Sequence, residues 1–171
     1  TDIGIQCFEC CYNIKYIILP PKIQLIDDYA FCGCLRLKYI NLPETINEIG
    51  MYAFYYCISL QSIIIPEVEI IEENTFNNCH HLNNVELHDN IKSLGPCSFA
   101  NCWNLTNITL PKNLRYIGYL GFHFTGLLSI HIPKNVTHID TGAFHSCYHL
   151  IAVVLSNGLQ HLGSFIFHSC Y

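Results

Sequence analysis

The sequence predicts an α/β repeat solenoid made of about seven coils, each 22–23 residues long. Eight of the ten phenylalanines fall on one register, and the steps between them are 22 or 23 residues. A fixed period in the twenties is typical of a solenoid, in which each coil buries its apolar face against the next. We expect one domain over residues 1–171, open at both ends as a fragment of a longer array. The register residues are Phe8, Phe31, Phe54, Phe76, Phe99, Phe122, Phe144 and Phe167.

A cysteine column runs in phase with these phenylalanines. Seven of the eleven cysteines lie three residues after a register Phe, and Thr125 takes this place in the remaining coil. Free cysteine is among the most buried residue types, so we interpret the column as core and not as a disulfide framework. The column consists of Cys11, Cys34, Cys57, Cys79, Cys102, Cys147 and Cys170; the off-register thiols, with more chance of exposure, are Cys7, Cys10, Cys32 and Cys97.

Two kinds of element are predicted within each coil. Residues 105–110 alternate apolar and polar side chains before Pro111, which predicts a short strand with one buried face. These strands would stack in parallel, about 4.8 Å apart, into one sheet. In residues 30–37 the apolar positions are spaced as on one face of a short helix. Glycines such as Gly50 or acids such as Asp27 precede this segment, which suggests an unusual backbone turn or a helix cap.

The complete unit reads Leu-x-x-Ile-x-Leu-Pro-x-x-Ile-x-x-Ile-Gly-x-x-Ala-Phe-x-x-Cys-x-x-Leu, and it resembles the BspA-like leucine-rich repeat family. Residues 30–60 and 143–150 show the match best, although Pro follows the strand where the commoner leucine-rich repeat has Asn. The resemblance implies a horseshoe or right-handed coil, with a concave parallel sheet and short helices or turns on the convex face. It also implies a surface antigen or adhesin that binds host components or proteins. It brings no catalytic residues and no cofactor, so we expect a protein that is not an enzyme.

Charge and hydropathy argue against two classes of partner. The net charge is −5, and the eight Lys and Arg residues are scattered singly, so the sequence lacks the basic footprint of a nucleic-acid-binding protein. No apolar run approaches the roughly 18 residues of a membrane span, so we expect no membrane insertion within this segment. The remaining partners are proteins and glycans.

The outward rows of the predicted strands are the default binding surface, because the concave face of a solenoid is extended. Tyr16, Tyr39, Ile18 and Ile64 form an aromatic and apolar patch at the N-terminal end, although they could simply cap a sheet edge. The candidate binding residues are Tyr16, Ile18, Tyr39, Asn41, Ile64, Asn84, Glu86, Asn107, Thr109 and His131.

Histidines form a second candidate site. His123, His145 and His168 each follow a register Phe directly, so they would line up on three adjacent coils. Neutral imidazoles in such a column could bind a transition metal or repel one another when protonated. The alternative is an exposed polar column with no ligand, and we assign no metal.

Two functions follow from these observations. The preferred one is a protein-binding or glycan-binding adhesion module, at the cell surface or secreted, that contacts its ligand through the concave sheet. The alternative is an intracellular, cytoplasmic scaffold for protein–protein interaction. Paired cysteines would favour the first and free thiols the second.

Overall fold

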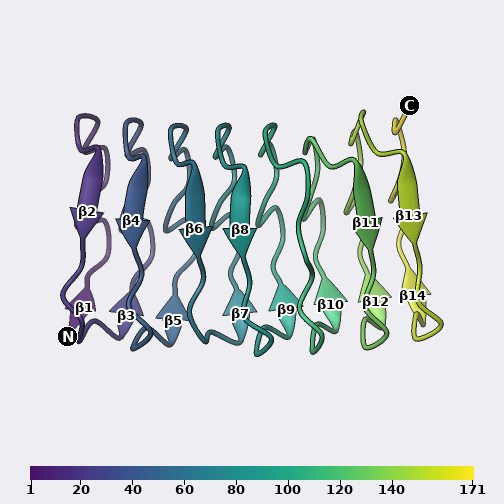
Figure 1. Ribbon diagram of the computed structural model, residues 1–171, viewed down its shortest axis with the longest axis horizontal. Coiled ribbons are helices and arrows are strands. Elements are labelled where there is room, and N and C mark those ends of the chain that lie inside the picture. The colour runs from purple at the N-terminus through teal and green to yellow at the C-terminus, as the bar shows by residue number, and fades with distance from the viewer.

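The computed structural model describes residues 1–171 as a stack of parallel coils, which confirms the predicted solenoid (Figure 1). Each complete coil passes once along each of two strand-bearing faces. The long-strand face carries β2 (Tyr16–Ile18), β4 (Tyr39–Asn41), β6 (Ser62–Ile64), β8 (Asn84–Glu86), β11 (Ser129–His131) and β13 (Ala152–Val154). The short-strand face carries β1 (Asp2–Ile3), β3 (Leu25–Ile26), β5 (Glu48–Ile49), β7 (Ile70–Ile71), β9 (Ser93–Leu94), β10 (Tyr116–Ile117), β12 (His138–Ile139) and β14 (His161–Leu162).

The long-strand face is not the single sheet that the sequence suggested. Its ladder hydrogen bonds join only β2 to β4, β6 to β8 and β11 to β13. The strand predicted at residues 105–110 is absent, although Ile108 and Leu110 point inward as the alternation requires. The alternation of apolar and polar residues indicates which side chains are buried. A ladder of hydrogen bonds also requires a neighbouring strand in register. The following coil, which carries β11, is one residue shorter, and the missing residue falls just before that strand.

The short-strand face is more continuous. Each unit has two further aliphatic residues after its proline position, three apart in the repeat, and in all coils but the last both are buried, as are Ile46 and Ile49. The second of them is the inward residue of a two-residue strand, and the residue before it points outward. Ile49, Ile71 and Leu94 show this inward position. Ladder bonds connect β1, β3 and β5, and then β7, β9, β10, β12 and β14 in unbroken order.

The predicted short helices are absent, and only the turn alternative to them is confirmed. The turn segment, defined as the eight residues that end at the cysteine column (residues 27–34 in one coil), has two positions with positive φ. They lie two residues before and two residues after the register Phe, as at Tyr52 (57°) and Tyr56 (58°). A right-handed helix requires negative φ throughout, so these residues exclude it.

Hydrogen bonding explains why the left-handed positions persist. In each of the seven coil-to-coil contacts, the Phe and both left-handed residues donate their N–H groups to carbonyls of the next coil. For example, Phe54 N–H donates to the Thr75 carbonyl at 2.9 Å, and Tyr52 N–H donates to the Glu73 carbonyl at 3.0 Å. In a helix, these N–H groups would instead form hydrogen bonds within their own coil. The turn segment therefore forms a third line of bonds between coils.

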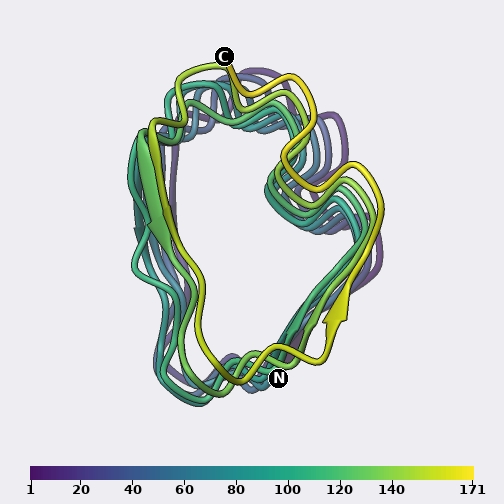
Figure 2. The ribbon, with the colours of Figure 1, turned by 90° about the vertical axis from the view of Figure 1, so that its right-hand side faces the viewer.

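The core follows the same columns. The register phenylalanines stack face to face with ring centroids 5.2–5.5 Å apart. Six of them belong to a cluster of 42 buried apolar residues, and the two terminal ones, Phe8 and Phe167, are partly buried against it. Packed helices would need about 8–10 Å per coil, against about 4.8 Å for strands, and that mismatch would curve the stack. Here the turn-segment side contains no helices, and its phenylalanine rings repeat at a distance close to the strand spacing. The coils therefore stand in a nearly straight row and overlap closely in the end view (Figures 1 and 2).

Glycine has a different role from the one predicted for it. Gly50 and Gly118 do not have positive φ. A Cβ atom at Gly118 would lie only 2.7 Å from the Gly95 carbonyl carbon, and one at Gly50 would lie 2.6 Å from the Asp28 nitrogen. These positions therefore need glycine because neighbouring coils approach closely. Asp27 caps a turn instead of a helix, since its carboxylate accepts the Asp28 N–H at 2.9 Å. No helix suited to crossing a membrane occurs.

Candidate binding surfaces

The long-strand face carries the predicted binding residues on its outer side. In each strand the middle residue, such as Ile40 or Ile63, points into the core, so the first and third residues point outward. The exposed candidates are Tyr16, Ile18, Tyr39, Ile64, Asn84, Glu86, Asn107, Thr109 and His131. Asn107 and Thr109 lie in the stretch without ladder bonds.

Asn41 is the exception among these candidates. Its side-chain oxygen accepts the Leu19 N–H at 2.7 Å, and its amide nitrogen donates to the Leu19 carbonyl at 3.5 Å. This use of both polar atoms holds two coils together and leaves Asn41 only half-exposed. Sequence alternation could not reveal this role, because it places Asn41 outward without showing its partner.

The four large apolar residues predicted to form a patch at the N-terminal end are exposed. Tyr16 and Tyr39 are paired across β2 and β4, and Ile18 follows Tyr16 in the outward row of the same strand. The exposed fractions are 65% for Tyr16, 48% for Tyr39, 84% for Ile18 and 64% for Ile64. Ile64 lies on β6, which has no ladder bonds to β4. The surface therefore presents large apolar side chains that its own chain does not cover.

The histidine column lies on the turn-segment side. The rings of His123 and His145 are 5.3 Å apart, and those of His145 and His168 are 5.0 Å apart and nearly parallel. The Nδ1 atom of His123 is hydrogen bonded to the His145 carbonyl at 2.9 Å. Burial lowers the pKa of His123, and its hydrogen bond to the His145 carbonyl offsets part of that effect. With Tyr119 and Phe165, the three rings line a groove of about 420 Å³.

The sequence assigned no metal to this column and left it only as a weak candidate site. The ring planes of His123 and His145 are tilted by 55° and those of His145 and His168 by 25°, and the rings follow one another along the stack. Tetrahedral coordination would require their nitrogens to converge on one point about 2.1 Å away. No group of three or more His, Cys, Asp or Glu side chains is arranged to hold a metal ion. A calorimetric titration with zinc at neutral pH tests the column directly.

The cysteine column is buried except at its two ends, where Cys11 and Cys170 are half-buried, and it has a hydrogen-bonding role that the sequence did not show. Six of its thiols donate to the carbonyl of the register Phe in the preceding coil, at 3.1–3.3 Å, as Cys102 does to Phe76. Thr125 donates instead to Phe122 of its own coil at 3.0 Å. All eleven cysteines are free, and Cys7 and Cys10 are exposed.

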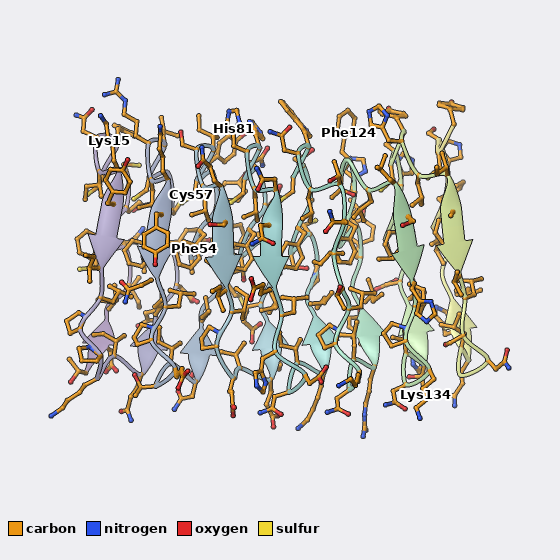
Figure 3. All side chains as sticks on the ribbon, in the orientation of Figure 1. Lys15, Phe54, Cys57, His81, Phe124 and Lys134 are labelled. Atoms are coloured by element: carbon orange, nitrogen blue, oxygen red, sulfur yellow. The ribbon has the colours of Figure 1, made fainter.

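An aromatic row, absent from the predicted sites, runs along one edge of the stack. It comprises His80, Trp103, Phe124, Tyr148 and Tyr171, each in ring contact with the next. Figure 3 shows Phe124 at this edge, opposite the edge that carries Lys134. Four members lie four residues after a register Phe, so the column could have been found by extending the repeat alignment by one position.

Three cationic residues that are scattered singly along the sequence come together in one groove. Lys92, Arg115 and Lys134 line one polar hollow of about 520 Å³ together with asparagine, glutamine and threonine side chains. Lys92 is paired with Glu69, which reduces the net charge of this hollow. The stacking of coils, and not sequence proximity, brings the three cations together.

Comparison with known proteins identifies the repeat. Six copies of the family described as "BspA type Leucine rich repeat region" match over residues 1–95 and 69–171. A leucine rich cell surface protein of Faecalibacterium prausnitzii A2-165 is similar at 30% identity and TM-score 0.83, over 90% of this chain and 42% of that one. The leucine rich repeat protein of T. pallidum is similar at 25% identity and TM-score 0.66, over 99% of this chain and 70% of that one.

A third solved structure shows the same fold alone. The pneumococcal vaccine antigen PcpA is 18% identical with a TM-score of 0.57, over 99% of this chain and 58% of that one. No curated protein matches the sequence. The chain thus spans less than half the length of the F. prausnitzii protein. The family match extends over the whole sequence, and the chain belongs to the BspA-type leucine-rich repeat family.

Proposed function

We propose that this chain is a non-enzymatic binding module of a surface-exposed or secreted repeat protein, which contacts a protein or glycan ligand through its long-strand face. The observation that carries the proposal is the exposed apolar patch of Tyr16, Ile18, Tyr39 and Ile64. Clusters of large exposed apolar side chains mark interaction sites, and tyrosine is enriched among the residues that dominate binding energy. The similar F. prausnitzii protein is named a cell surface protein, which supports a surface location.

The scaffold suits this function because its inward and outward side chains have different roles. Inward side chains repeat from coil to coil, whereas outward side chains on the long-strand face change from Tyr and Ile to Asn, Glu and His. A change on the outer side leaves the stacked core intact, so ligand contacts can vary without loss of the fold. The patch favours a protein partner at the N-terminal end, since its residues offer area and few polar groups.

Binding to purified extracellular-matrix and serum proteins, measured by biolayer interferometry, tests this proposal. The test variant combines Tyr16→Ser, Tyr39→Ser and Ile64→Ser, and the matched control is Glu86→Gln on the same face. We expect at least one protein to bind the wild type, and we expect about tenfold weaker binding by the triple variant. Equal binding by the wild type and the triple variant would show that the patch does not contact the ligand.

The alternative is an intracellular scaffold, in which all eleven cysteines would stay reduced. Six column cysteines donate S–H bonds to backbone carbonyls, which requires that they remain reduced. Thiol titration of the protein from its native host separates the two functions. Eleven free thiols would favour a reducing compartment, and a disulfide among Cys7, Cys10, Cys32 and Cys97 would favour secretion.

A further inference from the structure

Trp103 is the only tryptophan of the chain, and half of its surface is exposed on the edge formed by the aromatic row. One face of its indole is covered by His80, with ring centroids 4.0 Å apart and planes at 5°. Burial lowers the pKa of His80, which favours a neutral ring in this stack. The other indole face borders a hollow of about 410 Å³ that continues past Gly126.

Gly126 creates this hollow. At the same place in the repeat, other coils carry His80, Trp103, Tyr148 or Tyr171, whereas the shortened coil carries no side chain. A Cβ atom at Gly126 would overlap the Trp103 carbonyl oxygen, so glycine is required there. Trp103 and Tyr148 are therefore two coils apart, roughly 10 Å at strand spacing, and their column has a gap at the coil between them.

Phe124 forms one wall beside that gap. Its ring centroid is 6.4 Å from that of Trp103 and 5.2 Å from that of Tyr148, which it meets edge-on. A small notch of about 80 Å³, lined by these three aromatic side chains and His149, joins the larger hollow at Gly126. The two hollows together are called the aromatic groove.

The polar lining of the aromatic groove is uncharged. It includes Asn83, Asn104, Thr106 and His149, and none of the residues around either hollow is Asp, Glu, Lys or Arg. The side chains of Asn83, Thr106 and His149 make no hydrogen bond within the chain, and Asn104 has only a 3.4 Å contact with His81. Amide, hydroxyl and imidazole groups next to bare aromatic faces are therefore free for a ligand.

We propose that the aromatic groove binds a neutral glycan supplied by another molecule. A sugar ring presents an apolar face of C–H groups and a rim of hydroxyls, and the groove presents aromatic faces with uncharged donors and acceptors beside them. The electron-rich face of an aromatic ring attracts the slightly positive C–H hydrogens. A nucleotide or an acidic peptide would bring charges that nothing in this lining neutralises. The volume lies in the range that holds a small ligand.

This site is separate from the patch of the proposed function, so the two can fail independently. The tryptophan itself provides the probe, since all indole fluorescence comes from Trp103. Protein made in the bacterial cytosol leaves Asn104 unmodified, although Asn104-Leu105-Thr106 is an N-glycosylation acceptor sequence. The ligands are maltohexaose, cellohexaose, xylohexaose and chitohexaose, each titrated to about 10 mM because single-site sugar affinities are weak.

We expect a saturable change of Trp103 emission with at least one of the four oligosaccharides. In calorimetry with the same oligosaccharide, Trp103→Ala and Tyr148→Ala each weaken binding about tenfold, within the range found when aromatic stacking partners are truncated. Trp103→Phe has an intermediate effect, because a smaller ring remains. Tyr119→Ala, which removes an exposed tyrosine outside the groove, is the matched control and leaves binding unchanged.

Two results would overturn the glycan proposal. One is no saturable fluorescence change and no calorimetric heat with any of the four oligosaccharides. The other is binding that Trp103→Phe and Tyr148→Ala leave unaltered, in variants whose circular dichroism and melting temperature match the wild type. The triple variant of the long-strand patch keeps glycan binding if the two sites are independent.

Discussion

The turn segment and the long-strand face repeat with the same period, yet they connect the coils very differently. The turn segment makes three backbone hydrogen bonds in every coil-to-coil contact, and its phenylalanines stack without a gap from Phe8 to Phe167. The long-strand face has three separate two-stranded ladders and no ladder at residues 107–109. The segment that resembles an irregular loop is thus the more continuous structural element.

This difference teaches where the chain is free to vary. Stacking is maintained by the turn segment and the short-strand face, so side chains on the long-strand face and along the aromatic row can change with little effect on the fold. Both proposed binding sites lie in columns that change from coil to coil. Conversely, the columns that do not change are explained by packing and hydrogen bonds, as the cysteines show.

The largest expected effect concerns the buried thiols of the turn segment. Burial raises the pKa of Cys57, Cys79 and Cys102 well above the ordinary value near 9. When a thiol has a higher pKa in the folded state than in the unfolded state, its contribution to the free energy of unfolding is fully present below the unfolded-state pKa. That contribution falls as the pH rises above the unfolded-state pKa. Each such thiol costs about 1.4 kcal/mol per pH unit, so the three together cost about 4 kcal/mol per pH unit above about pH 9.

We therefore expect the protein to unfold cooperatively within about two pH units above pH 9. Circular dichroism under reducing conditions measures this unfolding. Cys102→Ala should reduce the slope of stability against pH by about 1.4 kcal/mol per unit, whereas Cys7→Ala, at an exposed position, should leave it unchanged. A protein that keeps its stability at pH 11 would show that these thiols are not protonated core groups.

The next effect comes from the phenylalanine stack. Phe76→Ala removes a fully buried ring between Phe54 and Phe99, and we expect a loss of about 3–5 kcal/mol in the free energy of unfolding, measured with urea. Tyr39→Ala on the long-strand face should change it by about 0.5 kcal/mol or less. Similar losses at both positions would contradict the division of roles between the two regions.

A smaller loss is expected where neighbouring coils approach closely. Gly118→Ala places a methyl group 2.7 Å from the Gly95 carbonyl carbon, so the backbones must separate. We expect a cost of about 1–3 kcal/mol, as for other overpacked positions, from thermal or urea unfolding. Gly4→Ala is the control, since nothing lies within 4 Å of its added Cβ atom. A neutral Gly118→Ala variant would mean that the coils are more loosely stacked.

Sequence periodicity predicted the solenoid, the core columns and the outward position of residues such as Tyr16 and Ile64, because burial repeats with the coil. Periodicity did not predict the structure where backbone hydrogen bonds between coils determine it. The spacing of Ala30, Cys34 and Leu37 fits a helix, but the two left-handed residues beside each Phe follow from hydrogen bonds between coils. The gap at Gly126 and the role of Asn41 also depend on contacts across coils, which one coil read alone does not contain.

Amide hydrogen exchange, followed residue by residue, tests the central comparison most directly. We predict strong protection at Phe54, Phe76 and Phe99 and at the left-handed residues beside them, because each N–H is bonded to the next coil. The amides of residues 107–109, which make no backbone hydrogen bond, should exchange much faster than those of β6 and β8. Fast exchange throughout the turn segment, with slow exchange at residues 107–109, would contradict this account.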